Sequence, residues 1–179
     1  MATDVVYYAA VGIDGRIAGP EHDLAFLETL AGGPEGDYDR FFAQVDSVVL
    51  GAETWRFLVA HGSWPYAGTP SWVVSHRELE PLRGAEGVER FEGDLAELVH
   101  AIGERGLRRT WLVGGGSLAA QLLDADLLDE LILTVAPTLV GRGPALADGT
   151  FPLRRFRLLE AARWGEGDGV RLRYSRARD

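Results

Sequence analysis

"TWLVGGGSLAAQLL", residues 110–123, places three consecutive glycines between an apolar run and a segment with helical spacing. Residues 111–113 are typical of a short buried strand, and the leucines from Leu118 onward share one face of a helix. Three glycines in succession cost more chain entropy than a turn requires. We therefore interpret this stretch as a strand–turn–helix unit whose turn lets a ligand approach the backbone closely.

Similar apolar runs alternate with helical patterns along most of the chain. The predicted strands cover 5–11, 47–50, 71–75, 88–91, 111–113 and 131–135. The predicted helices cover 23–30, 38–45, a segment from 53, 95–102 and a segment from 117. Two further strands, 156–164 and 170–174, flank a glycine-rich turn and predict an antiparallel hairpin. We expect one three-layer α/β domain over 1–179, with a mixed, mainly parallel sheet, helices on both faces and a C-terminal antiparallel hairpin.

The composition excludes several classes of function. The net charge of -9 argues against nucleic acid as a partner, because phosphate binding needs a basic surface. All 18 basic residues are arginine and there is no cysteine, which excludes Schiff-base lysine chemistry, thiol nucleophiles and thiolate metal sites. The sequence shows neither a convincing signal peptide nor a long apolar span. We expect a cytoplasmic protein with no metal and no membrane partner.

Three turns follow predicted strands, at the sheet edge where ligands of open α/β sheets bind. The turns that begin at Gly51 and Gly114 lead into helices, whose N-termini offer free N–H groups to an anion. The third turn, 75–77, ends in Arg77, which can hold a phosphate with two parallel hydrogen bonds. Together they fit a pyrophosphate plus one further phosphate, as in NADPH. Taken singly, Gly51 can serve packing alone, and 75–77 can be a solvated loop.

A Rossmann dinucleotide site is the competing interpretation of the glycine turn. Gly114, Gly116 and Ala119 satisfy its G-x-G-x-x-G/A pattern. That pattern belongs in the first βαβ unit of a domain, with an acidic residue at the end of the following strand. Here the following strand ends at Ala136 and Pro137, so we reject this interpretation.

The chain resembles the dihydrofolate reductase-like superfamily, in particular the reductase domain of bacterial riboflavin biosynthesis. The resemblance rests on YAAVGIDGRIAGPEHDL (8–24), VVLGAETW (48–55), WVVSHR (72–77), WLVGGGSLAAQLLDADLLDELILTVAPTLVGRGPAL (111–146) and the closing hairpin. It implies a reductase that binds NADPH in an extended form. The residues implied are Gly51, Thr54 and Trp55 at the pyrophosphate and adenosine side, Ser75, His76 and Arg77 at the 2′-phosphate, Gly114, Gly115, Gly116, Ser117 and Leu118 around the pyrophosphate, and Ala10 and Ile17 beside the nicotinamide.

The substrate end differs from the riboflavin branch. Asp23 falls where dihydrofolate reductases carry a pterin-binding carboxylate, which makes it the candidate catalytic residue, although Asp is also a good helix cap. The riboflavin branch has an acidic residue just ahead of the glycine loop and a D-x-P-x-L-x-x-R motif after the second strand. Gly114 and residues 58–61 stand in those places.

We expect a pterin-like or pyrimidine-derived small molecule as substrate. One alternative is a stand-alone 5-amino-6-(5-phosphoribosylamino)uracil reductase. Another is a non-catalytic module that binds NADPH or a pterin. In the hairpin, the apolar residues Val170, Leu172 and Tyr174 alternate with arginines and form a face that must be covered, and with the resemblance this predicts a homodimer.

Overall fold

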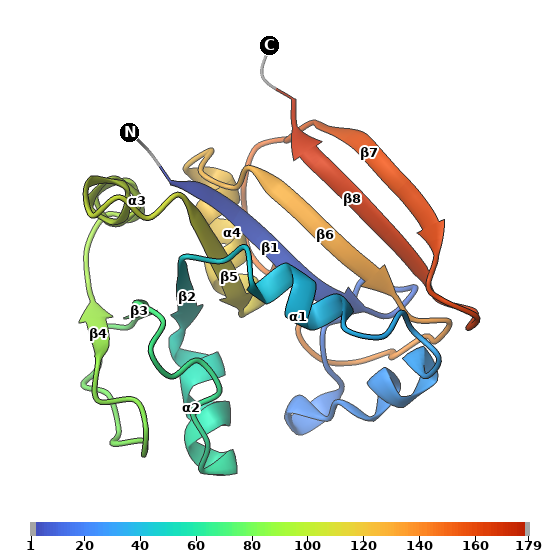
Figure 1. Ribbon diagram of the computed structural model, residues 1–179, viewed down its shortest axis with the longest axis horizontal. Helices are drawn as coiled ribbons and strands as arrows, with labels where there is room; N and C mark the ends of the chain where they lie inside the picture. Colours follow the sequence, from blue (N-terminus) through green and yellow to red (C-terminus); the bar gives the residue numbers. More distant parts are fainter. Residues whose placement is uncertain (1–2, 178–179) are drawn as a thin grey trace.

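The computed structural model describes residues 3–177, which build an eight-stranded sheet in the order β4-β3-β2-β5-β1-β6-β8-β7 (Figure 1). The strands are β1 (Asp4–Val11), β2 (Ser47–Gly51), β3 (Ser71–Val74), β4 (Val88–Phe91), β5 (Arg109–Gly114), β6 (Glu130–Val135), β7 (Phe156–Arg163) and β8 (Val170–Arg176). Neighbours from β4 to β6 pair in parallel, whereas β8 pairs antiparallel with both β6 and β7. The mixed, mainly parallel sheet and the antiparallel hairpin are therefore confirmed.

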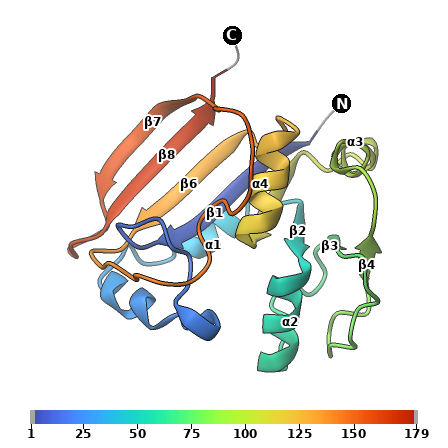
Figure 2. The ribbon, with the colours of Figure 1, turned by 180° about the vertical axis from the view of Figure 1, so that it is seen from behind.

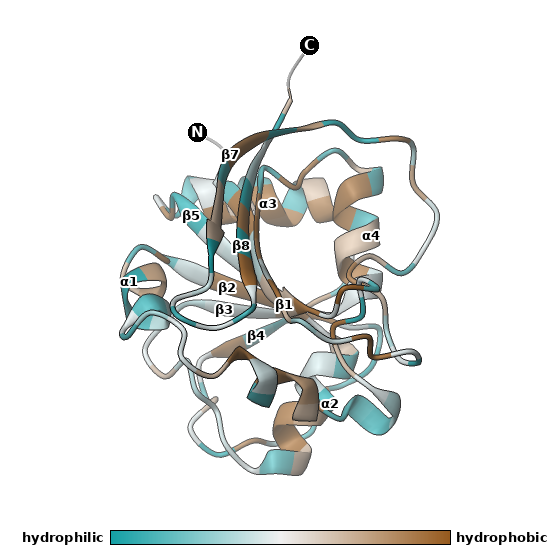
Figure 3. Cartoon of the chain, turned by 90° about the vertical axis from the view of Figure 1, so that its right-hand side faces the viewer, coloured by the Kyte–Doolittle hydropathy of each residue, from teal (hydrophilic) through white to brown (hydrophobic). Residues whose placement is uncertain are grey.

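Helices cover both faces of this sheet, as expected. The α-helices are α1 (Asp37–Phe42), α2 (Ala52–His61), α3 (Leu95–Glu104) and α4 (Gly116–Asp124). In Figure 3, α1 lies on one side of the strands and α4 on the other. Figure 2 shows α4 lying across its face of the sheet, close to β1.

The alternation of side chains along β1 explains why its sequence is apolar throughout. Val5 and Tyr7 are buried in a core that includes the leucines of α3 and α4. Val6 is buried in a second core on the opposite face, with Phe41 of α1 and Trp55 of α2. Because successive side chains of a strand point to opposite faces, a strand between two cores loses its polar positions.

The segment predicted as an α-helix over 23–30 instead holds a short 3₁₀ helix, η2 (Ala25–Leu30), and a second 3₁₀ helix, η1 (Pro20–His22), lies just before it. Glu21 and His22 have φ values of 55° and 62°, in the left-handed region, which prevents a continuous α-helix from starting earlier. The leucines here are spaced by three residues, which is also the repeat of a 3₁₀ helix. Spacing alone did not distinguish the two helix types.

Candidate functional site

A cavity of about 720 Å³ lies at the carboxyl ends of β1, β2, β3 and β5. It brings together the three turns that the sequence singled out, because parallel strands end at the same edge of the sheet. The sequence-predicted residues that line it are Ala10, Ile17, Gly51, Thr54, Ser75, His76, Gly114, Gly115, Gly116, Ser117 and Leu118.

Two helix N-termini meet at this cavity, and both begin with glycine. Gly51 precedes α2 and Gly115 precedes α4, and neither helix has a side chain that accepts a hydrogen bond from its first turn. A Cβ on Gly51 would lie 3.6 Å from the backbone N of Gly115, so the two turns pack nearly backbone to backbone. Uncapped N–H groups at the positive end of a helix dipole form a binding site for an anion.

The three glycines ahead of α4 have different physical reasons to be glycine. Gly114 has a φ of +146°, a conformation that disfavours side chains, and the Gly114–Gly115 peptide bond is cis. A Cβ on Gly116 would lie 2.1 Å from the backbone oxygen of Ala145, so the packing of the loop before Asp148 requires glycine there. Gly115 has a φ of -94°, and its Cβ would meet only the Thr54 hydroxyl, at an ordinary 3.6 Å.

The turn after β3 is closed by its own serine. The Ser75 hydroxyl donates to the backbone oxygen of Arg77 and accepts from the Arg77 N–H, at 2.9 and 3.0 Å. His76 is exposed at the cavity edge, with Nδ1 3.1 Å from a Glu92 carboxylate oxygen. Arg77 is also exposed but lies outside the cavity lining, so its guanidinium can reach only a group that extends beyond the edge.

Two residues proposed for the site lie elsewhere. The Trp55 side chain is only 4% exposed and packs against Trp64 in the core, with ring centroids 5.7 Å apart. The Asp23 carboxylate accepts the Ala25 N–H at 2.9 Å and lines a separate groove beside α2. Trp55 therefore has a structural place, and the Asp23 carboxylate closes a local turn ahead of η2, whose N-cap residue is Leu24.

Sequence reasoning missed the apolar half of the cavity. Aromatic and aliphatic side chains gather there on the α2 side of the sheet. They are Tyr8, Trp111, Tyr66, Phe57, Leu58, Leu24 and Leu27. The two-residue alternation places Tyr8 with Ala10, and Trp111 with Val113, but only the observed pairing of β1 with β5 brings these pairs together.

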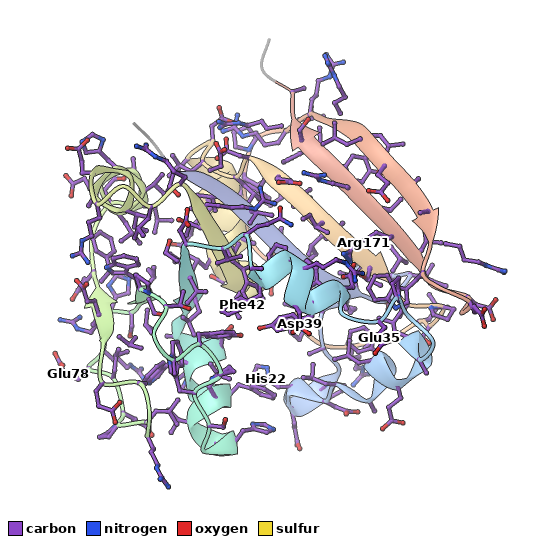
Figure 4. The ribbon with its side chains drawn as sticks, viewed as in Figure 1. His22, Glu35, Asp39, Phe42, Glu78 and Arg171 are labelled. Carbon is purple, nitrogen blue, oxygen red and sulfur yellow. The ribbon has the colours of Figure 1, made fainter. Side chains whose placement is uncertain are left out.

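A partly buried ion pair adjoins the Tyr8 end of this apolar wall. The Tyr8 hydroxyl donates to Asp37 at 3.0 Å, and Arg171 donates to the same carboxylate at 2.6 Å. Figure 4 shows Arg171 reaching from β8 toward α1. Its guanidinium also donates to Thr134 at 3.1 Å and lies over the Tyr8 ring. Burial, together with the Asp37 carboxylate, raises the pKa of Tyr8 to about 12, so this phenol stays neutral at physiological pH.

Residues 3–177 contain neither a metal-binding cluster nor a membrane-spanning helix. No three histidine or acidic side chains gather closely enough there to hold a metal ion. None of the helices in that part of the chain combines the length and apolar character needed to cross a membrane.

Comparison with known proteins places this chain in a family. The model of the RibD C-terminal domain matches residues 3–168. The uncharacterized protein YwjB of Bacillus subtilis is 28% identical over 99% of this chain and 100% of its own length. The 2,5-diamino-6-ribosylamino-4(3H)-pyrimidinone 5′-phosphate reductase of Archaeoglobus fulgidus is 34% identical over 50% of this chain and 41% of its own length.

A solved structure extends the likeness to the whole fold. A Shewanella sp. PV-4 protein, described as a riboflavin biosynthesis protein, superposes with a TM-score of 0.84 at 24% identity, covering 99% of this chain and 100% of its own. This agreement confirms the expected dihydrofolate reductase-like fold. Since the family model spans most of the sequence, the chain belongs to the family of RibD C-terminal domains.

Proposed function

We propose that this protein is an NADPH-dependent reductase that transfers a hydride to a pyrimidine-derived or pterin-like small molecule. The observation that carries the proposal is the pairing of two uncapped, glycine-led helix N-termini at one end of a cavity whose other half is apolar. A family relative that acts on a ribosylaminopyrimidinone supports the substrate class.

The residues present fit an extended dinucleotide. The N–H groups at the starts of α2 and α4 would hold the pyrophosphate, since neither start is capped by a side chain. His76 and Arg77, with the backbone at Ser75, would hold the 2′-phosphate at the outer edge. Ala10 and Ile17 would border the nicotinamide. NADPH, when bound, supplies the hydride.

The chain's own part in the reaction is to position the substrate and exclude water. The apolar wall around Trp111 and Tyr8 lowers the local dielectric, which strengthens the electrostatic effect of nearby dipoles on the transferred hydride. The Tyr8 hydroxyl already donates its hydrogen bond to Asp37. We therefore give Tyr8 the role of keeping the apolar wall in position. No side chain needs to act as a nucleophile.

The experiment is a titration with NADPH and with NADH, followed by the oxidation of NADPH on adding pyrimidines and pterins. Arg77→Ala should weaken NADPH binding roughly ten- to a hundredfold and leave NADH binding nearly unchanged, because only NADPH carries the 2′-phosphate. Equal weakening of both would assign Arg77 a structural role. A protein that binds NADPH but never oxidises it would favour the non-catalytic module.

We also propose that the protein is a cytoplasmic homodimer. Val170, Leu172 and Tyr174 lie on one face of the sheet, in register with Leu133 of β6 and Leu158 of β7. Leu158 is 52% exposed, so this apolar face continues to the open edge of the sheet. A second copy that packs on this face would bury it, and a monomer in sedimentation at micromolar concentration would exclude the dimer.

A further inference from the structure

The two halves of the cavity differ in their capacity to hold a negative charge. The half at α4 and β3 offers helix N-termini and the hydroxyls of Thr54 and Ser117. The half between Tyr8 and Phe57 offers rings and aliphatic chains. If the cofactor occupies the first half, as proposed above, the substrate must occupy the second.

The substrate half is lined by apolar side chains. The rings of Tyr66 and Trp111 meet edge to face, with centroids 5.3 Å apart and planes at 79°. Leu24 and Leu27 also line the cavity, although they are 36% and 37% exposed. A ring held in this half would bury apolar surface against these side chains.

Within residues 3–177, no arginine lines the cavity, and the sequence contains no lysine. Arg171, whose guanidinium lies over the Tyr8 ring, already donates to Asp37 and Thr134. The charged side chains that do line the cavity are carboxylates, those of Glu53, Glu92 and Asp148. A phosphate on the substrate would therefore be desolvated without a cationic partner.

The groove beside the cavity gives a phosphate no better partner. It carries three carboxylates, from Glu21, Asp23 and Glu53, against one guanidinium, and Arg56 is already paired with Glu53. His22 lines both the groove and the cavity, and its Nε2 lies 3.9 Å from the Glu53 carboxylate. Figure 4 shows His22 beside α2. A substituent that leaves the cavity here meets an excess of negative charge.

We propose that the substrate half of this cavity takes an uncharged compound without a phosphate, and that it discriminates against phosphate esters. This inference rests on the proposed function and narrows its substrate class. The relative from Archaeoglobus fulgidus is named as the reductase of a 5′-phosphate. This chain would differ from that relative in reducing a compound without the phosphate. Its substrate would then come from a reaction that has already removed, or never added, the phosphate.

The test is a pair of titrations of the full chain saturated with NADP⁺. The two probes are 5-amino-6-ribitylaminouracil and its 5′-phosphate, which differ only in the phosphate. We expect the phosphate-free compound to bind at least roughly tenfold more tightly. Equal or tighter binding of the phosphate ester, or no saturable binding of the phosphate-free compound, would overturn the inference.

A charge-gain variant sharpens this test. Leu27→Arg places a guanidinium at a position that is already partly exposed, and Leu27→Gln is the uncharged control. The arginine variant should bind the phosphate ester roughly fivefold more tightly than the glutamine variant does. The affinities of the two variants for the phosphate-free compound should agree within about twofold. An arginine variant that gains no affinity for the ester would show that missing positive charge does not set the preference. Failure of NADP⁺ itself to bind would instead refute the proposed function.

Discussion

Three helices follow strands of the parallel part of the sheet, and they begin in two different ways. The helix α3 starts after Asp94, whose carboxylate accepts the Ala96 N–H at 2.7 Å. The helices α2 and α4 start after Gly51 and Gly115, with no side-chain cap. A helix whose first N–H groups are satisfied by its own sequence needs no ligand there, whereas an uncapped start facing a cavity is available to an anion. The contrast distinguishes α3 from the two helices whose starts we propose to bind the pyrophosphate.

The largest effect on free energy should come from Gly116→Ala. This variant tests the packing of α4 against its neighbouring loop and not the uncapped start of the helix. Its Cβ would lie 2.1 Å from the backbone oxygen of Ala145, and backbone cannot rotate away as a side chain can. We expect a loss of about 3 kcal/mol in the free energy of unfolding, measured by urea denaturation. A variant as stable as the parent protein would mean that the loop at Ala145 is free to move.

Gly115→Asp should give α4 the same kind of start that α3 has. Gly115 has extended backbone angles, so an aspartate there can cap the helix without strain. We expect unchanged or higher stability, but a loss of NADPH affinity of roughly a hundredfold, about 2.7 kcal/mol, because the carboxylate occupies and repels the phosphate site.

The matched control for that variant is Gly115→Asn. Asparagine caps a helix about as well as aspartate but carries no charge. The asparagine variant should therefore lose less NADPH affinity than the aspartate variant does. Normal NADPH binding by the aspartate variant would place the pyrophosphate elsewhere.

Gly115→Ala should have a smaller effect on binding. Its Cβ has room beside Thr54, so the variant should unfold cooperatively and closer to the parent protein than Gly116→Ala does. We expect a loss of NADPH affinity of roughly tenfold, about 1.4 kcal/mol, because the methyl group stands where phosphate oxygens approach the backbone. Thermal melting and NADPH binding should be measured on one sample. A variant that melts at a lower temperature yet binds NADPH normally would mean that Gly115 serves only packing.

The smallest effect should come from Asp94→Ala in α3. Loss of the cap should lower the free energy of unfolding by about 1 kcal/mol and leave NADPH affinity unchanged. Thermal melting and NADPH titration of the same preparation test both halves of this expectation. A clear change in affinity would mean that α3 contributes to the site after all.

The sequence predicted the sheet-edge turns better than it predicted what lies between them. Gly51 and Gly114 could be placed at one edge because parallel strands end together. The aromatic wall could not be found, because only the neighbour relation of β1 and β5 brings Tyr8 near Trp111. Local spacing also failed at Leu24 and Leu27, where 3₁₀ and α-helical repeats overlap.

Two residue roles show a further limit of sequence reasoning. Trp55 was assigned to a ligand through a resemblance, but its position on α2 points it into the core beside Trp64. Asp23 fits both a cap and a catalytic residue by residue type, whereas in the structure its carboxylate accepts the Ala25 N–H in a local turn and Leu24 is the N-cap of η2. Side-chain direction depends on where a helix begins, and that boundary is the least certain part of a sequence prediction.

The ion pair at the Tyr8 end of the apolar wall has a consequence for how a newly made chain becomes competent to bind. Asp37 and Arg171 are separated by 134 residues, and the Tyr8 hydroxyl shares their carboxylate. Contacts between such distant parts of a chain form late, because a long loop must close before they can be made. During synthesis, the wall at Tyr8 therefore lacks its guanidinium until β8 has left the ribosome and paired with β6. We expect binding competence to be acquired in one late step, when the final hairpin closes.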